Sequence, residues 1–77
     1  MAELLEELAR RLVDHPSEVR VERAEREDGV TLLRLHVAPD DVGKVIGRKG
    51  RIARALRAVI RASAAQRRER VHIEIVE

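Results

Sequence analysis

Residues 41–57 read DVGKVIGRKGRIARALR, and this stretch decides the fold that we predict. Two glycines, Gly47 and Gly50, enclose two cations, Arg48 and Lys49. Glycine adopts positive φ angles without a steric penalty, so such a pair permits a tight turn and the close approach of a phosphate. The N-terminus of a following helix would offer free N–H groups to that phosphate. A corner in which Gly47 merely ends a helix would explain one glycine, but not the paired cations.

Helical patterns lie on both sides of this turn. Pro39 and the acids Asp40 and Asp41 favour a helix start, with a capping role for the acids, and a short helix is expected through about Ile46. A longer helix is predicted over residues 51–66. Its predicted buried stripe is Ile52, Ala55, Leu56, Val59 and Ile60, and its predicted guanidinium face is Arg54, Arg57 and Arg61.

The rest of the chain supplies one more helix and three strands. An amphipathic helix is predicted over residues 2–14, and strands over residues 19–26, 30–38 and 71–76. Asp28 and Gly29 indicate a hairpin turn between the first two strands. Since two helices join the second and third strands, these strands should lie parallel, with the helices on one face. The predicted fold is therefore an α+β two-layer sandwich with the order α-β-β-α-α-β and a three-stranded mixed sheet.

The charge of the chain is divided between its halves. Residues 1–41 contain six arginines and eleven acids, a net charge of −5, whereas residues 42–77 contain ten basic and three acidic residues, a net charge of +7. Residues 42–68 hold nine of these basic residues and no acid. A basic stretch on a folded scaffold predicts a polyanionic partner, which is nucleic acid or, less often, an anionic membrane surface.

The composition excludes several classes of protein. The chain has 77 residues, with no aromatic residue and no cysteine, and we expect a single domain over residues 1–77. It cannot stack bases on aromatic rings as RRM and most OB folds do, and it cannot form a disulfide or a thiolate zinc site. No apolar run exceeds three residues, so we expect a cytoplasmic protein without a signal peptide or membrane insertion.

The segment Val45-Ile46-Gly47-Arg48-Lys49-Gly50 resembles the KH domain, whose hallmark is an Ile-Gly-x-x-Gly loop between two helices. The order of elements resembles the type II, or prokaryotic, KH arrangement over the whole chain, as in small bacterial proteins with a single KH domain. The resemblance implies binding of single-stranded RNA in a groove for about four nucleotides, with the loop holding the backbone. Phosphate contacts are expected from the loop and nearby cations, and base contacts from aliphatic groove walls. Together these RNA-binding residues are Lys44, Val45, Ile46, Gly47, Arg48, Lys49, Gly50, Arg51, Ile52, Arg54, Leu56 and Arg57.

The resemblance also implies partners and a biological role. Proteins of this kind act as RNA chaperones or post-transcriptional regulators, form a homodimer or a heterodimer with a KhpB or Jag-type RNA-binding protein, and affect cell shape and cell wall biogenesis. No cofactor is expected. An alternative is a protein-interaction or ribosome-associated module that uses the basic face on a non-RNA partner. Anionic membranes are a further alternative, and duplex DNA is disfavoured because no recognition helix is evident.

Catalysis and metal binding find no support in the sequence. Ser17 and Ser63 have no base placed to activate them, and the glycine spacing fits neither nucleotide-binding fingerprint. The histidines are far apart, and those at positions 36 and 72 are expected to face solvent from strands. We therefore expect that the protein is not an enzyme.

Overall fold

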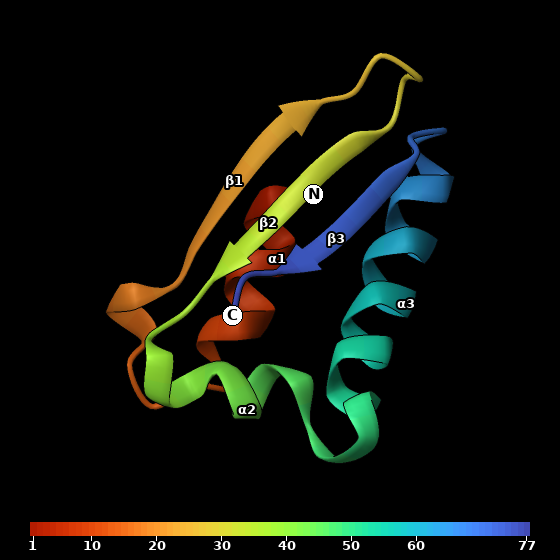
Figure 1. Cartoon of the computed structure of the whole chain (residues 1–77). Coiled ribbons are helices and arrows are strands. Elements are labelled where there is room, and N and C mark those ends of the chain that lie inside the picture. Colours follow the sequence, from red (N-terminus) through yellow and green to blue (C-terminus); the bar gives the residue numbers. More distant parts are fainter.

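The computed structural model describes residues 1–77 and shows a sheet covered on one face by helices. The elements in chain order are α1 (Ala2–Arg10), β1 (Arg20–Glu25), β2 (Thr31–His36), α2 (Val42–Ile46), α3 (Arg51–Gln66) and β3 (Val71–Ile75). Short 3-10 turns precede β1, precede α2 and join α2 to α3. The loop between α2 and α3 lies at one end of the molecule, and the β1–β2 hairpin lies at the other (Figure 1). The predicted α+β sandwich and its element order are confirmed.

The sheet has the order β1-β2-β3 and mixes both strand directions. β1 and β2 are antiparallel, whereas β2 and β3 are parallel, as the two-helix connection between them requires. The hairpin turns at Gly29, which has a φ of 82°, and the Asp28 Oδ1 accepts the Val30 N–H at 3.1 Å. β1 forms one edge of the sheet and β3 forms the other, and α3 runs beside the β3 edge (Figure 1).

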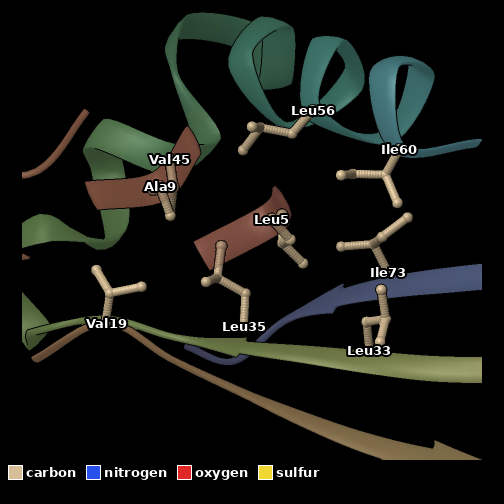
Figure 2. Packing of buried hydrophobic residues seen from close by; sticks show 9 residues of the cluster. All are labelled: Leu5, Ala9, Val19, Leu33, Leu35, Val45, Leu56, Ile60 and Ile73. Atoms are coloured by element: carbon tan, nitrogen blue, oxygen red, sulfur yellow. The ribbon is translucent and has the colours of Figure 1, made fainter. Parts of the chain in front are cut away.

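The core lies between the sheet and the three helices (Figure 2). Alternation in the strands points one face of the sheet at the helices, so Leu33, Leu35 and Ile73 are almost fully buried. Fully burying an aliphatic side chain of this size contributes about 1.5–3 kcal/mol. The helices and the start of β1 complete this cluster with Leu5, Ala9, Val19, Val45, Leu56 and Ile60.

The first helix ends earlier than its hydrophobic pattern predicts. A helix over residues 2–14 was expected, but α1 ends at Arg10. The Asp41 carboxylate accepts the N–H of Asp14 at 3.2 Å and the N–H of His15 at 2.9 Å. A continued helix would donate these two N–H groups to its own carbonyls. The chain therefore leaves the helix because a carboxylate distant in the sequence binds these groups.

The same contact corrects the role expected for Asp41. The side chain makes no capping hydrogen bond to its own helix, and it is fully buried between the end of α1 and the start of α2. Burial raises the pKa of the Asp41 carboxyl, but the two backbone N–H groups, with the charges of His15 and Lys44, outweigh burial and lower the pKa below the ordinary 3.8. Asp41 therefore remains a carboxylate, and it joins two segments of the fold.

The buried side of α3 is rotated from the predicted stripe. Ala53, Leu56, Ile60 and Ala64 are buried, whereas Ala55 and Val59 are exposed. Small alanines face the core because they allow the helix to lie close to its neighbours. As a result, an apolar flank of α3 remains at the surface.

Candidate nucleic-acid interface

Gly47 forms the sharp turn at the end of α2. Its φ is 78° and its ψ is 173°, and its N–H donates to the Gly43 carbonyl at 2.9 Å. A Cβ at this position would lie 2.6 Å from Cγ1 and 2.9 Å from Cδ1 of Ile52. Both the backbone angle and the available space therefore require glycine. The Ile52 side chain fills the inside of the turn and holds α3 against it.

The rest of the loop presents backbone N–H groups and cations together. Lys49 and Gly50 both have positive φ angles, 57° and 73°, and the Gly50 N–H donates to the Gly47 carbonyl at 3.1 Å. The backbone N–H groups of Arg48 and Lys49 belong to the same loop. They lie immediately before the N-terminus of the 16-residue helix α3, where the helix dipole is positive. Free N–H groups at such a position bind anionic oxygens.

The cations of the protein fall into two groups according to their ion pairs. All six arginines of residues 1–41 lie within 4.0 Å of a carboxylate, as does Lys44. The other nine cations have no carboxylate within 4.0 Å, and residues 42–68, which hold eight of them, contain no acid. They occupy the loop, the length of α3 and the connection to β3, and they are Arg48, Lys49, Arg51, Arg54, Arg57, Arg61, Arg67, Arg68 and Arg70.

An arginine flank runs along α3, and we define it as Arg54, Arg57 and Arg61. These residues are three and four positions apart, which places them on one side of the helix. Arg54 Nη1 donates to the Lys49 carbonyl at 2.8 Å, which fixes one guanidinium beside the loop. Arg57 Nε donates to the Ile73 carbonyl at 3.3 Å, so a second guanidinium lies at the open edge of β3. The flank thus borders the surface between α3 and the sheet.

A comparison with known protein families identifies the family to which this combination of loop and sheet belongs. The family model described as KhpA/KhpB, KH domain, matches residues 2–75. The chain belongs to this family. The predicted resemblance to KH domains is confirmed over nearly the whole chain.

Individual members of the KhpA/KhpB KH family are similar along their full length. The RNA-binding protein KhpA of Clostridium acetobutylicum is 50% identical over 76 residues, which cover 99% of this chain and 100% of the relative. KhpA of Halalkalibacterium halodurans is 49% identical over 78 residues, covering 100% of both chains. KhpA of Treponema pallidum is 51% identical over 75 residues, covering 97% of this chain and 92% of the relative.

A solved structure shows the same fold in a larger protein. The crystal structure of Era in complex with MgGDPNP and nucleotides 1506–1542 of 16S ribosomal RNA matches with a TM-score of 0.62 and 18% sequence identity. The match covers 96% of this chain and 28% of the Era chain. At this identity the likeness concerns the fold, and it supports the two-layer α+β arrangement of the KH family.

Lys44 differs from the other predicted RNA-binding cations. Its Nζ lies 3.1 Å from Asp14 Oδ2 and 3.8 Å from Asp41 Oδ1. The hydrogen bond to Asp14 and its charge raise the pKa of the Lys44 ammonium above the ordinary 10.5. Lys44 is therefore engaged in joining α2 to the segment after α1, and a phosphate would have to compete with two carboxylates for it.

The predicted aliphatic groove walls are only partly at the surface. Val45 has no exposed surface and Leu56 is 6% exposed, so the two side chains belong to the core. The expectation that Val45 contacts bases directly is therefore wrong in this conformation, because its side chain packs inward from α2. Ile46 and Ile52 are half-buried and retain surface near the loop.

An apolar groove of about 420 Å³ lies between α1 and α3, on the side of α3 away from the arginine flank. Val59 is 47% exposed and Leu12 is 38% exposed in this groove, and Arg11 and Arg51 are also among its lining residues. Arg51 therefore lies between the loop and the groove. Periodicity did not reveal this surface, because it assigned Val59 to the core.

The remaining chemical groups form no cluster that could hold a metal ion, because no three His, Asp or Glu side chains come together. His36 and His72 lie on the sheet face that points away from the helices, and His36 bonds to Glu22 on β1. No helix has the length and apolar character needed to cross a bilayer.

Proposed function

We propose that this protein binds single-stranded RNA, with the phosphates held by the Gly47–Gly50 loop and by Arg54 and Arg57 of α3. One observation carries the proposal: the nine cations without carboxylate partners are confined to the loop, α3 and the connection that follows. A cation that is already paired must break that pair to bind phosphate, whereas these nine are available. Membership of a family that includes RNA-binding proteins named KhpA supports the same proposal.

The proposed sequence of binding starts with electrostatic capture. Arg48, Lys49, Arg51, Arg54 and Arg57 attract the strand, and the backbone N–H groups at the start of α3 then hold one phosphate. Bases would be seated against the exposed parts of Ile46 and Ile52, which flank the loop. KH domains hold about four nucleotides in this way without aromatic stacking.

Fluorescence anisotropy with a short single-stranded RNA tests the proposal. Neutralising about four phosphates predicts that log affinity falls with log salt at a slope of about −3. The Arg48→Asp, Lys49→Asp double variant loses two phosphate contacts. Each contact contributes a salt slope of about −0.7, which is about fivefold in affinity at 0.1 M salt relative to 1 M salt, so the variant should bind about 25-fold more weakly at 0.1 M. Aspartate tolerates the positive φ of Lys49, so the variant should fold, and circular dichroism checks this.

The matched control is Arg20→Glu, Arg23→Glu on β1, which makes the same change in net charge. Both control arginines are ion-paired, and β1 is the sheet edge farthest from β3. The control should bind RNA with nearly the wild-type affinity. Equal losses in the control and in the loop variant would show that only net charge matters and would contradict the proposal. A salt slope near zero would favour a protein or ribosome partner instead.

The apolar groove between α1 and α3 favours a second function, which is association with another protein chain. We propose that a second copy of this chain, or a KhpB or Jag-type protein, covers Val59 and Leu12. A Val59→Asp variant should then sediment as a monomer at concentrations at which the wild type is a dimer. A wild type that remains monomeric, alone and with the purified KhpB-type protein, would contradict this proposal.

The remaining parts of the proposal follow from family membership. We propose that residues 1–77 form a single KH domain that acts without catalysis, as a cytoplasmic RNA chaperone or post-transcriptional regulator. Effects on cell shape and cell wall biogenesis are proposed as consequences of that regulation. Deleting the gene and restoring it with the Arg48→Asp, Lys49→Asp variant would test this role, because only the wild-type gene should restore normal cell shape.

A further inference from the structure

A second basic surface lies at the end of α3 opposite the loop. The end of α3, the β1–β2 hairpin turn and the start of β3 meet there (Figure 1). The Thr31 N–H donates to the Arg70 carbonyl at 2.9 Å and fixes the connection after α3 against the hairpin. Between these segments is a hollow of about 400 Å³ whose polar lining includes Arg26, Arg61, Arg70, His72 and one acid, Glu69. We call it the far-end hollow.

Two of its guanidinium groups are available for a ligand. Arg26 lies 3.0 Å from Asp28, whereas neither Arg61 nor Arg70 has a carboxylate within 4.0 Å. Arg61 is also the last member of the arginine flank, so the hollow continues the row of cations that begins at the loop. Two unpaired guanidiniums beside one exposed carboxylate make a site with a positive excess, and phosphate oxygens are the acceptors that arginine matches best.

Beside the hollow, Arg68 occupies a backbone position at which glycine would be more stable. α3 ends in a Schellman motif, in which Glu69 N–H donates to the Ala64 carbonyl at 2.9 Å and Arg68 N–H to the Ala65 carbonyl at 3.0 Å. The residue at this turn is usually glycine, but here it is Arg68, with a φ of 57°. The only other non-glycine residue with a positive φ is Lys49. Each end of α3 thus carries a strained cation, one of them in the loop.

We infer that the far-end hollow is a second phosphate-binding site, and that it takes a backbone phosphate of the same RNA strand that the Gly47–Gly50 loop holds. The inference rests on the proposed function. Arg61 lies about 15 Å along α3 from Arg51, and Arg70 lies beyond the end of the helix, so a strand must run along α3 to touch both sites. A strand of about four nucleotides fills the loop and the adjoining surface, and only a longer strand reaches Arg61 and Arg70. Arg54 and Arg57 lie between the sites and shield the charge of the connecting phosphates.

RNA length is the variable that tests this inference. Anisotropy would be measured with an RNA of about five nucleotides and one of about twelve, for the wild type and an Arg61→Gln, Arg70→Gln variant. For each phosphate held in the hollow, the longer RNA should gain about fivefold in affinity at 0.1 M salt relative to 1 M, and its salt slope should steepen by about 0.7. The variant should lose this gain and keep the wild-type affinity for the short RNA. An Arg20→Gln, Arg23→Gln variant, with the same loss of charge, should keep both.

Each contrary result has a distinct meaning. If the Arg61→Gln, Arg70→Gln variant weakens both RNAs equally, or retains the gain of the longer one, the inference is wrong and the proposed function stands. If two short RNAs bind each wild-type molecule and only one binds the variant, the hollow takes a phosphate from a separate strand, and the single path is refuted. If the wild type binds neither RNA, the proposed function fails and the inference fails with it.

Discussion

Replacing Gly47 by alanine gives the sharpest test of how the loop is built. Two separate effects act on the new Cβ. The φ of 78° with a ψ of 173° lies in a region that only glycine adopts readily, and the Cβ would lie 2.6 Å from Ile52 Cγ1. The backbone effect costs about 1–3 kcal/mol. Forcing an extra carbon against a packed side chain costs a further 1–3 kcal/mol, approximately.

The sum, about 2–6 kcal/mol, is a large part of the total stability of a domain of this size, which is about 4–12 kcal/mol. Urea unfolding followed by circular dichroism measures it, since the chain has no aromatic residue for fluorescence. Gly50→Ala should cost only about 1–2 kcal/mol, because its φ is also positive but its Cβ would meet only Arg54 Nη1, at 3.5 Å. Gly43→Ala is the matched control, since it meets nothing within 4 Å in α2, and it should stabilise by about 0.4–1 kcal/mol.

A double-mutant cycle separates the two effects at Gly47. Ile52→Ala removes Cγ1 and Cδ1, the two atoms nearest the new Cβ. The Gly47→Ala, Ile52→Ala protein should therefore be more stable than the sum of the single changes predicts, by about 1–3 kcal/mol. Additive single changes would show that Ile52 does not hold the turn. A Gly47→Ala cost no greater than that of Gly50→Ala would refute the whole account of the loop.

Three further changes have defined outcomes. Asp41→Asn should make the protein less stable than the wild type at pH values above the ordinary carboxyl pKa of 3.8. Because the pKa of Asp41 is lowered in the folded state, the extra stability of the wild type should disappear as the pH falls from about 3.8 through that lower value. Acid titrations of both proteins, followed by circular dichroism, would measure this loss. Arg68→Gly should remove backbone strain and raise the melting temperature by about 4–8 °C while weakening binding of the longer RNA, and an unchanged or lower melting temperature would contradict the strain. Arg57→Gln should weaken RNA binding about fivefold at 0.1 M salt with little loss of stability, and an unchanged salt slope would place the RNA elsewhere.

The fold could be predicted because its deciding signals are local. Gly47 and Gly50 require a turn between two helices, and alternation in residues 30–38 and 71–76 fixes which strand face is buried. The connection through two helices then determines that β2 and β3 are parallel. Each of these steps depends on residues that are neighbours in the sequence, and the predicted bounds of α3 agree with the structure.

The errors all come from contacts between distant residues. Asp41 is 27 residues from Asp14 and 26 from His15, so no periodicity could show that it ends α1. The orientation of α3 depends on which side α1 and the sheet cover, and the sequence pattern shows only that one side is apolar. Arg70 and Arg26 come together through the hairpin and the start of β3. The sequence contained one signal for the far-end hollow: Arg61 follows Arg57 by four residues and so extends the row of arginines along one side of α3 towards the hollow.

The structure of α3 indicates how one short helix could serve two partners. Its buried side packs on the core, its arginine flank borders β3, and its exposed apolar flank faces the groove beside α1. Arg57 and Val59 are two positions apart and therefore about 160° apart around the helix axis. A second copy seated on Val59 would leave Arg57 uncovered, so a dimer would carry two RNA paths that face away from each other. Two linked paths bind one long RNA more tightly than either path alone. For such an RNA, Val59→Asp should lower affinity without changing the contacts of Arg57, whereas a five-nucleotide RNA should bind this variant and the wild type equally.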